Sequence, residues 1–162
     1  MLDFERMVLD HQDRLFAFGL GLSGSRADAE EIAQEAFLRA YRALLSYPEQ
    51  RLRELKVRPW LYQIALNVFR NRVRGGRPPL GSLNGSEPSR ERGPEETVVG
   101  TQEVVRRLAA LPARYREPLV LRYVQDLPLA EVAAVLGQPV GTVKSNVHRG
   151  LQQLRGGLSD EG

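Results

Sequence analysis

Apolar residues recur along the chain at helical spacing, and no stretch alternates apolar and polar residues as a strand would. The clearest pattern lies in residues 28–44, where one face is apolar throughout: Ala29, Ile32, Ala33, Ala36, Phe37, Ala40, Tyr41 and Leu44. Asp28, with Glu31 three residues on, is the expected N-cap of this helix. A weaker amphipathic pattern predicts a helix over 2–20, and Pro59 favours a helix start before 60–74.

Residues 75–95 interrupt the pattern with a stretch rich in Gly, Pro, Ser and charge. Such a composition holds too few apolar residues to offset the entropy lost on ordering, so it predicts a flexible linker. Beyond it we expect helices near 101–111, 114–124, 128–136 and 141–155. The sequence therefore predicts an all-α protein of two small helical domains, with domain boundaries at 1–74 and 101–158 and a linker at 75–100.

Residues Leu129–His148, LAEVAAVLGQPVGTVKSNVH, predict a helix-turn-helix. The small Ala133 suits the helix crossing, and Gly137 suits a turn with positive φ. The expected shared core is Val132, Leu136, Val140, Val143 and Val147. The second helix then presents polar side chains suited to the base edges and phosphates of a DNA major groove: Thr142, Ser145, His148, Arg149 and Gln152, with Lys144 on the flank. A helical hairpin that only packs against the rest of the protein is the alternative.

Charge changes the picture once it is counted by segment. The whole chain carries 23 basic and 20 acidic residues, a net charge of +3, which by itself indicates no particular partner. Residues 1–50, however, hold 5 basic and 9 acidic side chains, residues 51–77 hold 8 and 1, and residues 106–158 hold 8 and 3. Two basic blocks favour contact with nucleic acid, and the second coincides with the predicted helix-turn-helix.

The first basic block combines aromatic and cationic residues on one predicted helix, 60–74. Its core face is Leu61, Ile64, Ala65 and Val68, which leaves a polar stripe of Gln63, Asn67, Arg70 and Arg74. Aromatic and amide groups together suit unpaired bases, which stack and expose edges that a duplex hides. For Trp60 alone, packing in the core is the favoured interpretation.

The acidic segment, residues 1–50, contains a candidate surface of a different kind. On the face of residues 28–44 opposite its core lie Glu31, Glu35, Leu38 and Arg42. A leucine among charges indicates a protein-docking face, although single exposed leucines also occur on ordinary solvated faces.

Several activities lack the residues that they need. The chain has no cysteine and only two distant histidines, which excludes a disulfide framework and makes a metal site improbable. We find no catalytic motif and expect neither an enzyme nor a cofactor. Gly19–Gly24 matches G-x-G-x-x-G, but a predicted helix precedes it where a dinucleotide fold needs a strand, so a glycine-loosened helix end is the better interpretation. Without a signal peptide or membrane span, we expect a cytoplasmic protein without membrane contact of its own.

Taken together and in this order, the segments resemble the extracytoplasmic-function (ECF) group of the sigma-70 family, which are small bacterial RNA polymerase sigma factors. DAEEIAQEAFLRAYRAL (Asp28–Leu44) and PWLYQIALNVFRNR (Pro59–Arg72) are similar to the family's region 2. Leu108–Arg155 is similar to its region 4.

The resemblance implies that region 2 binds core RNA polymerase through the β′ clamp coiled coil and captures the melted minus-10 strand of promoter DNA. It implies that region 4 reads the minus-35 duplex and contacts the β flap. By motif position, the polymerase-binding residues are Glu31, Gln34, Glu35, Leu38 and Arg42. The minus-10 residues are Trp60, Gln63, Asn67, Arg70 and Asn71. The minus-35 residues are Lys144, Ser145, His148 and Arg149, with Arg122 and Thr142 at the DNA backbone.

The resemblance also implies an anti-sigma factor as a partner. Asn146 departs from the family pattern, because many relatives carry arginine there, and this leaves the minus-35 sequence open. The alternatives are a stand-alone helix-turn-helix repressor or activator, which would bind duplex DNA without polymerase, and a protein-interaction adaptor, whose activity would not depend on Arg149.

Overall fold

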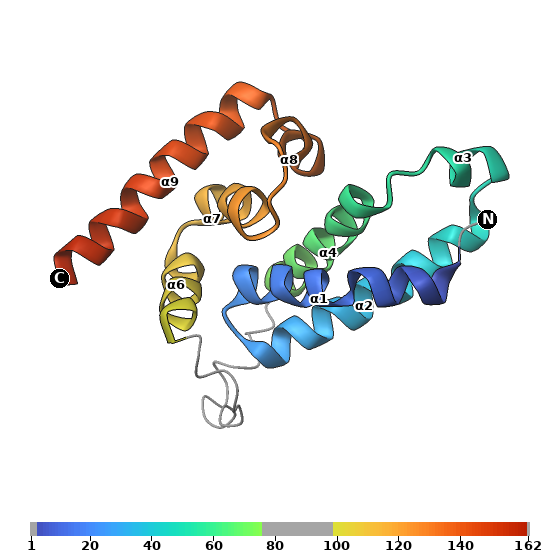
Figure 1. The fold of residues 1–162 in the computed structure, drawn as a ribbon, viewed down its shortest axis with the longest axis horizontal. Coiled ribbons are helices and arrows are strands. Elements are labelled where there is room, and N and C mark those ends of the chain that lie inside the picture. The colour runs from blue at the N-terminus through green and yellow to red at the C-terminus, as the bar shows by residue number, and fades with distance from the viewer. Residues whose placement is uncertain (1–2, 76–98, 162) are drawn as a thin grey trace.

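The computed structural model describes residues 3–75 and 99–161, which fold into helices without any strand in these two ranges (Figure 1). The predicted all-α fold is confirmed. The described elements are, in chain order, α1 (Phe4–Ser23), α2 (Arg26–Ser46), α3 (Glu49–Glu54), α4 (Val57–Arg74), α6 (Val99–Ala110), α7 (Ala113–Leu119), the π-helix η3 (Val120–Val124), α8 (Leu129–Leu136) and α9 (Val140–Glu161). Most of the predicted linker, residues 76–98, lies outside the described residues.

The turn between α1 and α2 is built from two caps. α1 ends at Gly24, whose φ of 73° is the left-handed conformation that glycine adopts without strain. The N-cap of α2 is Ser25, whose hydroxyl accepts a hydrogen bond from the Asp28 backbone N–H at 3.1 Å. The prediction of Asp28 as the N-cap is therefore wrong. Asp28 lies in the first turn and is only 2% exposed. Its carboxylate accepts a hydrogen bond from Arg72 of α4 at 2.9 Å, which offsets part of the cost of burying the charge.

The glycines near the end of α1 allow neighbouring helices to pack closely against it. The motif Gly19–Gly24 lies at a helix end, as the sequence predicts: the helix continues through Gly19 and Gly21 to Ser23, and Gly24 is its C-cap. A Cβ atom on Gly19 would lie 3.1 Å from the Ala29 Cα, and one on Gly21 would lie 3.0 Å from a methyl group of Val120. Because glycine has no Cβ, α1 approaches α2 on one side and η3 on another.

The predicted helix over 114–124 divides at a proline. Pro118 lies inside α7 and has no backbone N–H to donate. Immediately afterwards the backbone widens into η3, where the Gln125 N–H donates to the Val120 carbonyl at 3.0 Å. Asp126 follows with a φ of 60°. This turn places the Gln125 side chain, 2% exposed, against the N-terminal helices.

α8 and α9 form the predicted helix-turn-helix. Gly137 ends α8 with a φ of 68°, as the sequence predicts for the turn. Val132, Val143 and Val147 are buried, whereas the expected burial of Val140 is wrong: it is 46% exposed because it is the first residue of α9 and precedes the crossing of the two helices. Tyr41 of α2, another expected core residue, is 46% exposed.

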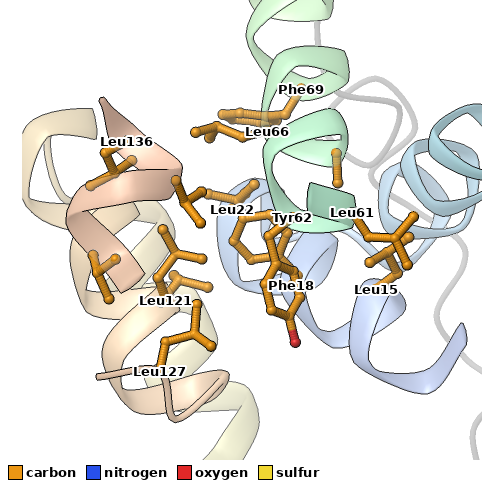
Figure 2. Close-up of a cluster of buried hydrophobic side chains, with 14 of the residues drawn as sticks. Leu15, Phe18, Leu22, Leu61, Tyr62, Leu66, Phe69, Leu121, Leu127 and Leu136 are labelled. Carbon is orange, nitrogen blue, oxygen red and sulfur yellow. The ribbon is translucent and has the colours of Figure 1, made fainter. Parts of the chain in front are cut away.

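The N-terminal helices α1–α4 and the C-terminal helices α6–α9 share one buried cluster. α4 packs against α8, and α1 packs against α6, α7 and η3. Figure 2 shows part of this cluster: Phe18 and Leu22 of α1 and Tyr62 and Leu66 of α4 lie toward Leu121, Leu127 and Leu136, whereas Leu15 and Leu61 lie on the far side, among the N-terminal helices. Within the described ranges, no helix combines the length and apolarity needed to cross a membrane.

Candidate protein-docking and nucleic-acid interfaces

The first candidate surface is a groove of about 480 Å³ between α2 and α4. Four of the five predicted polymerase-binding residues line it, and the opposite wall comes from α4: Glu31, Gln34, Glu35 and Leu38 on one side, Val68, Asn71 and Arg72 on the other. Leu38 is 50% exposed among these charged neighbours, as the sequence predicts. The fifth residue, Arg42, is also exposed and lies outside the groove.

Ion pairs hold this groove in shape. Arg72 donates to the Asp28 carboxylate and to the Glu31 carboxylate, both at 2.9 Å, and its side chain is only 15% exposed. Glu35 accepts from the Arg39 Nε at 3.0 Å. A guanidinium shared by two carboxylates of α2 ties α2 to α4, and it fixes Glu31 at the rim of the groove.

The second candidate surface is a groove of about 350 Å³ at the N-terminal end of α4, beside α3. Trp60 and Gln63 line it together with the cationic residues Arg51 and Lys56. The Trp60 indole N–H donates to the Tyr47 hydroxyl at 3.2 Å, and the two ring centroids are 6.1 Å apart. The groove thus combines an aromatic ring, an amide and two cations with one carboxylate, that of Glu54.

Sequence reasoning missed Arg51 in the wall of this second groove, and Tyr47, which contacts Trp60 and Arg51. Tyr47 ends α2 as its C-cap, and Arg51 of α3 places its guanidinium 3.8 Å from the Tyr47 ring centroid. The only available signal was an aromatic residue before a basic segment, because α3 is too short to show a helical period.

The other predicted minus-10 residues lie apart from this groove. Asn67 is exposed on α4. Asn71 lines the groove between α2 and α4, among the predicted polymerase-binding residues, and accepts from Arg74 at 2.7 Å. Arg70 donates to both carboxylate oxygens of Glu117 in α7, at 2.6 and 3.3 Å. The structure therefore brings together only Trp60 and Gln63 of the five.

The third candidate surface is a groove of about 580 Å³ along α9. It gathers four of the six predicted minus-35 residues: Arg122, Lys144, Ser145 and His148. Thr142 and Arg149 are exposed on α9 outside the groove. Arg122 donates to the Leu127 carbonyl at 3.2 Å, and its guanidinium lies 5.5 Å from the centroid of the Tyr123 ring. Tyr123, 56% exposed at the end of η3, was missed because the π-turn that positions it has no sequence signature of its own.

Comparison with known proteins shows which families the segments that form these surfaces match. The sigma-70 region 2 family model matches residues 7–78, and the sigma-70 region 4 family model matches residues 101–154. The ECF RNA polymerase sigma factor SigW of Bacillus subtilis is 33% identical over 97% of this chain and 89% of its own length. The ECF RNA polymerase sigma factor SigE of Mycolicibacterium smegmatis is 32% identical over 96% of this chain and 61% of its own.

Solved structures show the same fold. The sigma factor RpoE of Bartonella quintana, in complex with the anti-sigma factor NepR, superposes with a TM-score of 0.78 at 24% identity over 97% of both chains. CnrH, in complex with the cytosolic domain of CnrY, superposes with a TM-score of 0.73 at 23% identity over 98% of this chain and 89% of its own.

Helices that match sigma-70 region 2, followed by a helix-turn-helix that matches region 4, define a sigma-70-type transcription initiation factor. Within that class, the chain belongs to the ECF RNA polymerase sigma factors. As such it directs promoter-specific initiation by bacterial core RNA polymerase, through recognition of minus-35 duplex and melted minus-10 DNA.

Proposed function

We propose that each of the three grooves of this sigma factor binds a different partner. The groove between α2 and α4 binds the β′ clamp coiled coil, the groove at Trp60 binds the melted minus-10 strand, and the groove along α9 binds the minus-35 duplex. Region 2 then corresponds to residues 1–74 and region 4 to 101–158, which also contacts the β flap. The chain acts in the cytoplasm and is not itself a catalyst. One observation supports this proposal most strongly. Most of the residues predicted to bind polymerase lie in one groove, and most of those predicted to bind the minus-35 duplex lie in another.

In the groove between α2 and α4, here called the docking groove, Leu38 supplies an apolar contact. The charged residues around Leu38 orient the partner. When a partner covers an exposed leucine, the free energy of binding becomes more favourable by roughly 25 cal/mol for each Å² of apolar surface removed from water. Glu31 and Glu35 at its edges favour a partner that presents basic side chains, because complementary charge steers association. The partner that fits this groove is therefore an amphipathic, partly basic protein surface, such as a helix of the clamp.

In the minus-10 groove, the Trp60 ring offers a surface on which an unpaired base can stack, and Tyr47 packs against Trp60. Stacking on an aromatic side chain contributes about 1–3 kcal/mol for each base, which offsets the few kcal/mol lost when a base leaves the duplex. In the groove, Gln63 carries an amide that can hydrogen-bond an exposed base edge, and Arg51 and Lys56 supply charge for the phosphates. Asn67, exposed on α4 outside the groove, offers a second amide to a strand that continues along the helix. These groups favour single-stranded DNA over duplex.

In the minus-35 groove, the short or flexible polar groups of α9 suit a major groove. Lys144, Ser145 and His148 form one exposed wall, with Arg149 beside them. Arg122, held by the Leu127 carbonyl, sits where a DNA backbone would pass. A partner of the anti-sigma type, as in the RpoE complex, would have to cover these surfaces to silence the factor.

Asn67→Ala is expected to reduce promoter opening while leaving polymerase binding intact. Removing the amide removes a base-edge contact available only after melting, which should lower the fraction of open complexes about tenfold. A promoter for the assay comes from transcripts that core polymerase and this chain start on the bacterium's own genomic DNA. Permanganate reactivity of unpaired thymines reports opening, and a pull-down reports polymerase binding.

Gln12→Ala is the matched control, since it removes an exposed amide of α1 in the same region, outside all three grooves. Equal loss of opening and of polymerase binding in Asn67→Ala would mean that Asn67 is structural rather than a strand contact.

A further inference from the structure

A turn of π-helix borders the groove along α9. In η3 the Gln125 N–H donates to the Val120 carbonyl at 3.0 Å, five residues back, so the backbone turn is wider than in an α-helix. Asp126 follows with a φ of 60°, which is uncommon for a residue other than glycine. The first helix of the helix-turn-helix, α8, begins at Leu129. Single π-turns are frequent at functional sites, and this one shortly precedes the DNA-binding motif.

Tyr123 is the residue of η3 that this turn exposes most. Its exposed fraction is 56%, whereas Leu121, two residues earlier, is completely buried. Tyr123 lines the groove together with Lys144, Ser145 and His148 of α9. An exposed tyrosine presents an apolar ring face and a hydroxyl that can donate a hydrogen bond. The groove thus contains an aromatic group in addition to the polar side chains of α9.

The Tyr123 ring and the Arg122 guanidinium lie close together. The guanidinium carbon is 5.5 Å from the ring centroid, and Arg122 also donates to the Leu127 carbonyl at 3.2 Å. Asp126 is 4.0 Å from the same guanidinium and is exposed, so this ion pair is weak and screened by solvent. An arginine has five N–H donors, and the hydrogen bond to Leu127 uses only one of them. The ring and the carbonyl therefore orient Arg122 while leaving donors for an anion.

A phosphate of duplex DNA is the ligand that suits these two side chains. The second helix of a helix-turn-helix lies in the major groove, while the first helix crosses the DNA backbone. Tyr123 and Arg122 belong to η3, which leads into that first helix, so they are placed for the backbone rather than for base edges. Arginine and tyrosine both commonly donate hydrogen bonds to phosphate oxygens. Lys144 of α9 adds positive charge to the same groove, which attracts a polyanion.

We propose that Tyr123 and Arg122 form a phosphate-binding site, here called the η3 phosphate site, at the edge of the minus-35 groove. The Tyr123 hydroxyl donates to a backbone phosphate, and the ring holds the Arg122 guanidinium toward the same strand. Tyr123 therefore adds affinity for duplex DNA of any sequence, while Lys144, Ser145 and His148 read the bases. The inference rests on the proposed function, because it takes the groove along α9 as the minus-35 site.

Two substitutions separate the effect of the hydroxyl from that of the ring. Tyr123→Phe removes only the hydrogen-bond donor and should weaken binding to duplex DNA about threefold. Tyr123→Ala also removes the ring that orients Arg122 and should weaken binding at least about tenfold. The chain is titrated into a fluorescein-labelled duplex that carries the minus-35 element of one of the promoters found on genomic DNA. Fluorescence anisotropy then gives the dissociation constant at several salt concentrations.

The dependence of binding on sequence and on salt distinguishes a phosphate contact from a base contact. On a duplex with a scrambled minus-35 element, Tyr123→Ala should lose affinity by the same factor, because phosphate contacts do not depend on sequence. The slope of log affinity against log salt should become shallower by about one unit in Tyr123→Ala, as Arg122 leaves its phosphate, and stay unchanged in Tyr123→Phe. A loss confined to the minus-35 duplex would overturn the phosphate assignment.

Val124→Ala is the matched control, because Val124 is the next residue of η3, is 43% exposed and lines none of the three grooves. It should bind both duplexes as the wild-type chain does. If Tyr123→Ala bound as tightly as Val124→Ala, the η3 phosphate site would be disproved. If instead the wild-type chain did not prefer the minus-35 duplex to the scrambled one, the proposed function of this groove would fail, and the loss in Tyr123→Ala would still test the phosphate site.

Discussion

Leu38→Arg is expected to weaken binding of core polymerase by about a hundredfold, an effect of about 2.7 kcal/mol. Leu38 is half exposed in the free chain and shares the α2 wall of the docking groove with the acidic residues Glu31 and Glu35. In the proposed complex an arginine there would be desolvated where the partner offers an apolar contact. It would also attract the Glu31 and Glu35 charges that the basic partner needs. Fluorescence anisotropy of labelled chain, titrated with core polymerase, measures the dissociation constant.

Leu9→Arg is the matched control for this experiment. Leu9 lies on α1 of the same region and is 65% exposed, but it lines none of the three grooves. The same substitution there should change polymerase binding less than about threefold, since exposed substitutions away from an interface cost little. If Leu38→Arg bound polymerase as tightly as Leu9→Arg, the face between α2 and α4 would be an ordinary solvated surface.

Arg72→Ala is expected to lower the free energy of unfolding by about 3 kcal/mol, because it removes a charged partner of the buried Asp28 carboxylate. Asp28 is 2% exposed, and Arg72 is one of its charged partners across the junction of α2 and α4. Removing the guanidinium leaves the carboxylate with weaker compensation and also frees Glu31 at the docking groove. Urea unfolding followed by circular dichroism gives the free energy, and the same variant should bind polymerase less tightly.

Arg53→Ala tests whether burial is the reason for the effect. Arg53 pairs with Glu49 on α3 at 3.4 Å, but the two side chains are 66% and 84% exposed. Such a surface pair contributes less than about 1 kcal/mol, so its loss should be small. Similar losses of stability in both variants would show that the Arg72 ion pairs do not depend on their burial.

The helix faces were predictable from the sequence because burial follows the helical period. The apolar faces of residues 28–44 and 60–74 place Leu38 and Asn67 outward without knowledge of tertiary structure. The helix-turn-helix was predictable because Gly137 and its flanking valines satisfy geometric requirements of the turn. Two of the three candidate surfaces, the groove between α2 and α4 and the groove along α9, could therefore be predicted mainly from such local patterns.

The junction between the regions was not predictable, because it depends on residues whose local signals point elsewhere. Glu117 reads as an ordinary helical charge, and only the folded chain brings it to Arg70, 47 residues away in sequence. Gln125 reaches Tyr62 because Pro118 precedes a π-turn that shifts the helix phase. The pattern indicated Asp28 as the N-cap of α2, whereas Ser25 caps the helix and Asp28 pairs with Arg72, 44 residues away in sequence.

The most direct test of the central claim is transcription by core polymerase on genomic DNA from the bacterium that encodes the chain. Sequencing of transcript 5′ ends, with and without the chain, identifies the starts that it directs. We expect a new set of starts that share upstream minus-35 and minus-10 elements, whereas the chain alone should protect duplex DNA only weakly. Tight protection of a duplex site by the chain alone, with no new start when polymerase is added, would contradict it.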